Sequence, residues 1–583
     1  MNKKQLTLSL LLVSATATVS AEIISDLSQC QPATALSEHV EQGKWRIVTF
    51  ETEKIRGKML TAASFIEAPP VTLSLGRKGW HAVRLGVWNP YFAYDGTPIV
   101  KVKLTGDAAF RQIHVPTRED TQETTYLREI FLGEEDLTGR DLVIAKSNGR
   151  LPKSAYLAYV KLEPLTPDRV ATIQADRRQN DTRNLVSSID GSSYFHRSEV
   201  SEPEHILELV ELYRHSDVGK VIWAVTYGSH TNFPTTVEGA HFLGETDRTR
   251  LLRGVPGNDY IRGESQFYST IRDFARRGMI AQQIAAKHVQ EMGIKFDLMF
   301  RLGILGGFGF WHDADNYTRN HPEFRQVRRD GTLLEKTSYA FPEVQSFMLS
   351  VIREAITLID ADGINLCFVR GPHFLVLEEP IVQAFQKKYG EDARKVPEDD
   401  PRLLATRAEL MTNFLVRIRQ VLDEVGEARG KRLTISAWVW PWESDVWLGG
   451  SPLEEGLDVK RWIQDGLLDS VICQSAIDKT YLELGKKHGC QFVYFTGYHG
   501  DRRPNPKNIH DAYQHGVEAF AFWDLDSPQS VPGSWNWLRR IGHRDEVEAW
   551  AKEGLPSEAL IPLTRIHGSN AKDGLSDAVY SGG

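Results

Sequence analysis

A strand-then-helix pattern that repeats from about Asn184 onward constrains the fold of this chain more than any other feature. Eight short apolar runs alternate with helical periods over roughly 370 residues, which fits a (β/α)8 barrel with enlarged loops. The alternative is a doubly wound open sheet, but no glycine-rich phosphate loop follows the first strand candidate. The strand candidates are Leu185–Asp190, Val221–Tyr227, Phe296–Leu302, Gly363–Val369, Leu433–Trp438, Ser470–Gln474, Phe492–Thr496 and Ala519–Asp524. The helical periods include Pro203–Arg214, Glu264–Met292, Glu343–Ile359, Thr406–Ala428, Val459–Gln464, Asp478–Lys487 and Asn508–His515.

Residues 22–180 follow a different pattern, in which short strand candidates are separated by turns. Turn signals such as Asp95-Gly96 and Asn148-Gly149 punctuate this region, and it has no long helical period. The pattern predicts an N-terminal all-β sandwich ahead of a barrel domain at 181–553. An accessory, carbohydrate-binding role for the sandwich stays open. Residues 554–583 form a C-terminal tail that we expect to be weakly structured.

The first 21 residues have the composition of a secretory signal. Lys3 and Lys4 form a charged start, Leu6–Val19 is a short apolar stretch, and Val19-Ser20-Ala21 offers small residues at the cleavage positions. We therefore expect an exported protein that is periplasmic or extracellular. The apolar stretch is too short for a bilayer span, and no later segment approaches the roughly 20 apolar residues that one needs. No transmembrane segment is predicted.

Composition and spacing exclude several classes of function. Four cysteines in 583 residues do not build a disulfide framework, and their spacing fits no zinc motif. The His/Asp cluster at His312–Asp315 fits no named metal motif either, so neither a metal nor a cofactor is predicted. The formal net charge is −8 and basic residues are scattered, which argues against a nucleic-acid partner. The oligomeric state stays open.

The run from Trp438 to Glu443 places three indoles and a carboxylate at the end of the fifth strand candidate. Successive side chains of a strand point to opposite faces, so Trp438 and Trp440 should face one side and Ala437 the other. Flat aromatic faces beside an acid suit a sugar ring, which is apolar on its C–H face and rimmed with hydroxyls. The alternative is that these indoles, with Trp442, belong to the core or to an interface. Their grouping favours a carbohydrate site.

Acids at the ends of the strand candidates are the candidates for catalysis, because barrel enzymes build their active sites there. Glycoside hydrolysis needs two carboxylates, one that donates a proton and one that attacks or activates water. Glu443 is the first choice for the donor, because the flanking indoles would desolvate it and raise its pKa. Asp190 or Asp524 would be its partner, and Asp526 and Asp501 are less secure candidates. The alternative for each Asp is that it caps the next helix or pairs with an arginine.

Two arginines, Arg301 and Arg370, end neighbouring strand candidates and could converge at the mouth of the barrel. Paired N–H donors from two guanidiniums would bind a carboxylate or a sulfate, which indicates an anionic sugar. Alternatively, the arginines pair with the acids and hold the site together. The other substrate-binding candidates at the strand ends are Tyr227, His230, His312, Trp438, Trp440, Trp442, Gln474, Tyr498, His499 and Trp523.

The stretch Asp360–Arg370 resembles the fourth-strand motif of glycoside hydrolase-like barrel proteins, the group often called family-ten glycosylhydrolase-like. The segment Asn320–Phe324 resembles their substrate-side loops, and the resemblance covers roughly residues 184–545. It implies a barrel that acts on, or binds, an oligo- or polysaccharide. Many such sequences carry Asp where this one has Cys367, so a fourth-strand carboxylate cannot be carried over.

The sequence therefore predicts an exported glycoside hydrolase that uses two carboxylates on an oligo- or polysaccharide, with an anionic sugar as one option. Two alternatives stay open. A polysaccharide lyase would use Arg301 or Arg370 to neutralise a uronate, and Tyr498 or His499 as its base. A glycan-binding protein on a decayed barrel would be consistent with Cys367.

Overall fold

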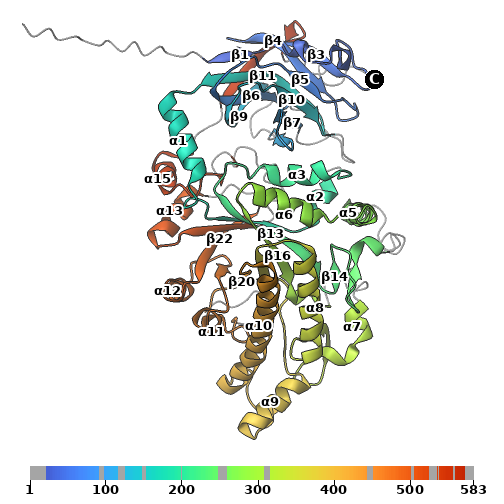
Figure 1. Ribbon diagram of the computed structural model, residues 1–583, viewed down its shortest axis with the longest axis vertical. Helices are drawn as coiled ribbons and strands as arrows, with labels where there is room; N and C mark the ends of the chain where they lie inside the picture. Colours follow the sequence, from blue (N-terminus) through green and yellow to red (C-terminus); the bar gives the residue numbers. More distant parts are fainter. Residues whose placement is uncertain are drawn as a thin grey trace, which may run out of the picture.

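The computed structural model describes residues 21–90, 98–115, 125–147, 153–197, 200–246, 259–306, 316–442, 451–499, 505–523, 535, 538–555 and 559–571. A β-rich N-terminal region lies at one end of the molecule, and a barrel surrounded by helices makes up the rest (Figure 1). Nearly all of the expected signal segment falls outside the described residues.

Eight parallel strands close into a barrel, as the repeated pattern predicts. Their order is β12-β13-β16-β19-β20-β21-β22-β23, and β23 pairs with β12 to complete the ring. Spatial order thus follows chain order, as a (β/α)8 barrel requires, and this prediction is confirmed. The strands are β12 (Leu185–Ile189), β13 (Val218–Tyr227), β16 (Lys295–Arg301), β19 (Gly363–Cys367), β20 (Thr434–Val439), β21 (Ser470–Cys473), β22 (Gln491–His499) and β23 (Ala519–Trp523). Short strands added to this domain are β14 (His230–Thr231), β15 (His241–Phe242), β17 (Arg325–Val327) and β18 (Leu333–Thr337).

Helices cover the outside of the barrel, with one departure from the sequence pattern. The helix expected at Glu264–Met292 is two helices, α5 (Asp259–Arg276) and α6 (Ala281–Glu291), because the chain turns at Gly278, whose φ is +70°. In the part of the chain that the structure describes, no helix combines the length and apolar character needed to cross a membrane. The other helices are α1 (Pro167–Arg178), α2 (Ser193–Arg197), α3 (Pro203–Glu211), α7 (Asn316–Asn320), α8 (Pro342–Leu358), α9 (Glu379–Tyr389), α10 (Pro401–Arg429), α11 (Val459–Gln464), α12 (Lys479–His488), α13 (Pro506–Gln514) and α15 (Arg544–Glu553).

The barrel strands divide their side chains between two cores. Outward side chains such as Ile435 and Val439 pack with the surrounding helices. Inward side chains form a separate cluster that includes Cys367, Trp438 and Trp523. The division follows the alternation expected of a strand. Because the Trp438 and Trp523 rings meet edge to face with centroids 4.5 Å apart, bulky side chains fill the barrel interior near the strand ends.

Two mainly antiparallel sheets make up the N-terminal region, with β2 and β3 as a parallel pair. The larger has the order β2-β3-β4-β11-β6-β9-β24-β25, with β1 paired to β11, and the smaller has the order β5-β10-β7-β8. Both sheets contribute to one apolar core, where Val83 and Leu157 of the larger sheet lie with Val102 and Ile144 of the smaller. The sandwich prediction is thus confirmed in part. The strands are β1 (Glu22–Ile24), β2 (Leu36–Ser37), β3 (Trp45–Thr52), β4 (Arg56–Ala62), β5 (Val71–Leu73), β6 (Trp80–Trp88), β7 (Ile99–Leu104), β8 (Arg111–His114), β9 (Tyr126–Asp136), β10 (Leu142–Lys146), β11 (Ala155–Pro164), β24 (Leu560–Ile566) and β25 (Ser569–Asn570).

Strand β24, from near the C-terminus, belongs to the N-terminal region. It pairs antiparallel with both β3 and β9, so that β3, β4, β11, β6, β9 and β24 form a closed ring of strands. Leu563 and Ile566 are buried in a cluster with Phe50 and Tyr159. The expectation of a weakly structured segment after Gly554 is wrong here, because the apolar side chains of β24 pack in a sheet formed far away in the sequence.

The N-terminal region packs against the end of the barrel where the strands start. Glu208 of α3 pairs with Lys101 of β7 at 2.6 Å and accepts a hydrogen bond from Gln112 of β8 at 3.0 Å. Arg177, near the end of α1, lies 3.9 Å from Glu135 of β9. Since α1 and α3 lead into β12 and β13, this interface lies opposite the end where a barrel's active site is built.

Candidate functional site

Two arginines meet one indole at the C-terminal ends of the barrel strands. Arg301 ends β16, Arg370 follows β19, and Trp523 ends β23. The two guanidinium carbons lie 5.7 Å and 5.0 Å from the centroid of the Trp523 ring, within the range of a cation–π contact. Arg301 is half-buried and Arg370 is exposed. Two like charges that share one aromatic ring create a position where an anion is electrostatically favoured.

Asp190 stands beside this pair and is held as an anion. It accepts hydrogen bonds from the backbone N–H groups of Ser192 and Ser193 at 2.9 Å and 2.8 Å, and one from the Ser193 hydroxyl. Burial acts to raise the pKa of Asp190, but the Arg301 charge and these hydrogen bonds outweigh it and hold that pKa below its ordinary value. The Tyr227 hydroxyl donates to the Asp190 backbone carbonyl at 2.5 Å, and its ring lies 5.2 Å from the Arg301 guanidinium. Asp190 therefore fits the structural alternative: its carboxylate is bound in the turn before the next helix, and the Arg301 charge stabilises its ionised form.

The three indoles of the Trp438–Glu443 run occupy three different environments. Trp438 is fully buried in the barrel interior, and its Nε1 donates to Oε1 of Gln474 at 2.7 Å. Trp440 is half-buried at the strand end. Trp442 packs with the surrounding helices, and the Lys460 ammonium of α11 lies 4.0 Å from its ring centroid. Trp438 is thus a core residue, as the alternative interpretation of this run expects. The three rings do not form one flat face.

Several donors at the strand ends are buried without a hydrogen-bond partner among the described residues. They are Nε1 of Trp440, Nε1 of Trp523 and the Thr496 hydroxyl of β22. An unsatisfied buried donor costs about 1–3 kcal/mol, and native proteins pair nearly all such groups. A hydroxyl-rich ligand at the strand ends would satisfy donors of this kind.

A buried acid that the sequence pattern did not single out lies next to this site. Glu264, near the start of α5, is fully buried, and its Oε1 lies 3.1 Å from Nε2 of His196 in α2. The pKa of Tyr227 is raised chiefly by burial and by the Asp190 charge, and Glu264 adds to that rise, so the two carboxylates flank one tyrosine. The sequence placed Glu264 on a helix face. Its one available signal was the position of an acid soon after the second strand.

The remaining sequence candidates are placed only in part. His230 of β14 is buried and meets His241 edge to face, with ring centroids 5.4 Å apart. Tyr498 and His499 belong to β22, but their side chains are not part of what the structure describes. Their roles stay predictions, as do those of the candidates that fall outside the described residues, Glu443, Asp524, His312, Asp501 and Asp526.

Cys367 occupies the position where the resembling barrel proteins often carry an acid. It is fully buried in the barrel interior. Burial raises the pKa of its thiol, although Arg301 and Arg370 act in the opposite direction. A neutral, buried thiol behaves as a small apolar side chain. Within the described ranges, no group of three or more His, Cys, Asp or Glu side chains could hold a metal ion.

Comparisons with known proteins add no family assignment. No protein-family model and no curated protein matches the chain. Among solved structures, the chain is similar to an alpha-L-fucosidase isoenzyme 2 from Paenibacillus thiaminolyticus, with 12% identity, a TM-score of 0.40, and coverage of 64% of this chain and 50% of that one. It is also similar to the catalytic domain of a beta-amylase from Paenibacillus polymyxa (12%, TM-score 0.40, 63% and 99%). A third is the PgaB (BpsB) glycoside hydrolase domain from Bordetella bronchiseptica (11%, TM-score 0.37, 64% and 99%). These TM-scores are low, so the identification of the barrel is based on the strand pairing alone.

Proposed function

We propose that this chain is an exported glycoside hydrolase that binds an acidic oligo- or polysaccharide at the C-terminal ends of its barrel strands. One observation carries the proposal: the Arg301 and Arg370 guanidiniums both lie over the Trp523 ring. The buried ring holds two guanidiniums near each other at the strand ends, and such a pair of guanidiniums suits a uronate or a sulfate ester. The buried N–H groups of Trp440 and Trp523, which have no partner in the described ranges, add donors for sugar oxygens.

In this proposal Asp190 acts as a carboxylate rather than as an acid. A group whose pKa is held low cannot donate a proton near neutral pH, but it can attack the anomeric carbon, activate water or stabilise positive charge. The proton donor must therefore be a different residue with a raised pKa. Glu443 keeps this role and Asp524 is its alternative, on the sequence argument that neighbouring indoles would desolvate Glu443.

The test is an assay of the purified protein on matched panels of neutral, uronate-bearing and sulfated oligosaccharides. We expect new reducing ends from an acidic panel, and a fall of about 100- to 1,000-fold in kcat for Asp190→Asn and for Glu443→Gln. Asp465→Asn, an exposed carboxylate on the helical side of the barrel, serves as the matched control and should retain full activity.

Two results would overturn the proposal. Products that carry a new carbon–carbon double bond, detected by their ultraviolet absorbance, would assign the chain to the polysaccharide lyases. Saturable binding without new reducing ends, even after long incubation, would make it a glycan-binding protein. Export is tested separately by mass spectrometry of the secreted protein, whose expected first residue is Glu22.

A further inference from the structure

A second candidate site lies at the opposite end of the barrel, between the two parts of the molecule. A cavity of about 80 Å³ is lined by β8 and β9 of the N-terminal region, the end of α1, the segment after α3, and Trp535, Arg539 and Arg540. One water molecule needs roughly 10–15 Å³ of such space, so this cavity has room for several. Its polar lining comes mainly from arginines.

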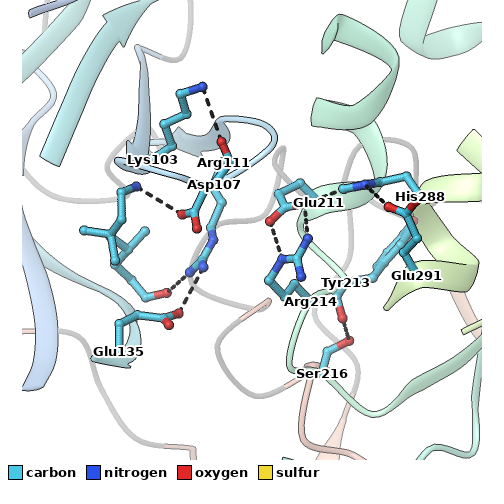
Figure 2. Close-up of polar contacts among 12 residues, drawn as sticks. Lys103, Asp107, Arg111, Glu135, Glu211, Tyr213, Arg214, Ser216, His288 and Glu291 are labelled. Atoms are coloured by element: carbon cyan, nitrogen blue, oxygen red, sulfur yellow. Dashed lines mark hydrogen bonds and ion pairs between the residues drawn. The ribbon is translucent and has the colours of Figure 1, made fainter. Parts of the chain in front are cut away.

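Four of the five lining arginines have carboxylate partners, and one of the four, Arg540, pairs with both Asp176 and Glu546. Arg111 pairs with Glu135 at 3.0 Å, and Arg177 lies 3.9 Å from the same carboxylate. Arg214 pairs with Glu211, a fully buried side chain of α3. Figure 2 shows the Arg111–Glu135 pair from the N-terminal region and the Arg214–Glu211 pair from the barrel domain. One Glu135 carboxylate is thus shared by two guanidiniums.

Arg539 differs from these arginines, because no ion pair within the described residues joins its guanidinium to a carboxylate, although the charges of Glu134, Asp217 and Glu546 act on it at longer range. Among the described residues its guanidinium makes one contact, with the face of the Phe131 ring at 5.2 Å from the centroid. Burial, and then the neighbouring Arg540, lower the pKa of Arg539 to about 10, so it stays charged at neutral pH. A guanidinium that lines a cavity and has no direct ion pair in the described part of the chain suits the centre of an anion site.

His215 provides a second polar group without a partner. It lines the same cavity, and within the described part of the chain its ring makes no hydrogen bond. Its backbone has φ +57°, in the left-handed region that few non-glycine residues adopt. Burial, followed by the charges of Arg177, Arg111 and Arg214, lowers the pKa of His215 to about 3, so the ring is neutral and keeps one N–H donor.

We propose that this cavity binds a small oxyanion: a phosphate, a sulfate or a carboxylate group. The anion would sit between Arg539 and His215 and the guanidiniums of Arg111 and Arg177, and so join the N-terminal sheets to the barrel. The cavity volume suits one such group rather than a whole sugar ring. The inference does not depend on the proposed function, because the site lies at the strand starts, away from Trp523.

Binding is tested on the full-length protein with sodium phosphate, sodium sulfate and sodium glucuronate, each against sodium chloride at equal ionic strength. We expect a saturable rise in the melting temperature and a matching dissociation constant by titration calorimetry. Arg539→Gln should weaken binding at least tenfold, whereas Arg276→Gln, an exposed arginine of α5, should leave it unchanged. His215→Asn is the second variant, because Asn tolerates a left-handed backbone, and it should also weaken binding.

The anions distinguish the source of the ligand. Arg539-dependent binding of phosphate or sulfate alone assigns the cavity to a free inorganic ion, and equal binding of glucuronate extends it to an acid carried by a sugar. The proposal is overturned if none of the three anions binds beyond the chloride control. It is also overturned if both variants fold and bind as tightly as the parent.

Discussion

Arg214 at the strand starts and two arginines at the strand ends, Arg301 and Arg370, have different partners. At the strand starts, Arg214 is matched by the buried carboxylate of Glu211, which also lies 2.6 Å from Nε2 of His288 (Figure 2). At the strand ends, Arg301 and Arg370 lie over an aromatic ring instead. Charges satisfied by the protein stabilise a fold, and charges left for a ligand support binding at some cost in stability. The number of arginines in a region therefore does not locate a binding site. The partner of each arginine is what distinguishes a binding site from a structural ion pair.

The largest effect should come from breaking the strand-start network. Glu211→Gln removes the charge that faces Arg214 and His288, and it should lower the free energy of unfolding by about 3–5 kcal/mol, because the partly buried Arg214 guanidinium loses its carboxylate partner. The measurement is the shift of the urea midpoint. Glu291→Gln is the matched control, since its exposed carboxylate lies 3.9 Å from the same histidine and should contribute less than about 1 kcal/mol. Equal losses of stability in Glu211→Gln and Glu291→Gln would contradict the distinction between the buried and the exposed carboxylate.

Acid should weaken the same network. Burial acts to raise the pKa of Glu211, but hydrogen bonds and charges from His288 and Arg214 outweigh it and lower that pKa from 4.5 to about 2. The carboxylate therefore stabilises the folded state fully above about pH 4.5, and this contribution, of about 3 kcal/mol, is lost as the pH falls toward 2. The stability difference between the parent and Glu211→Gln should shrink over that window. If the stability difference between the parent and Glu211→Gln stays constant with pH, the ionised form of Glu211 does not stabilise the fold.

Changing an arginine at the strand ends should affect turnover more than stability. Arg301→Gln removes one of the two charges over Trp523 and should lower kcat/KM on an acidic saccharide about 10- to 100-fold, with little effect on a neutral one. Arg432→Gln is the control at the opposite end, where the guanidinium is exposed and pairs with Asp469. Parallel losses on both substrates would remove the arginine from anion recognition.

The smallest expected effect separates two indoles of one run. Trp440→Phe deletes a buried N–H that has no partner among the residues that the structure describes, and it should reduce kcat/KM about 2- to 10-fold, the value of one hydrogen bond, without loss of stability. Trp442→Phe should change kcat/KM less, because that ring packs with helices and Lys460. If Trp442→Phe has the larger effect on kcat/KM, the assignment of these two rings is wrong.

The barrel could be predicted from the sequence because its signals are local. The apolar pattern of a buried strand or of an amphipathic helix is visible within a few residues. The expectation of one helix at Glu264–Met292 was wrong, because it overlooked Gly278, where the chain turns between α5 and α6. The alternation in β20 correctly assigned faces to Trp438 and Ala437, but it could not say how deep along the strand an indole is buried. The contact between His196 and Glu264 depends on how two helices pack, which no spacing in the sequence encodes.

Strand β24 follows the barrel in the sequence but pairs with strands that precede the barrel. Thr52 of β3 pairs with Leu563 of β24, so the first region to be synthesised completes its sheet only after the whole barrel has been made. Cutting the chain after the barrel would leave β3 and β9 with unpaired edges, which are templates for aggregation. The larger sheet of the N-terminal region is therefore complete only when β24 has been made. A gene fragment that ends where the barrel ends encodes an incomplete sheet.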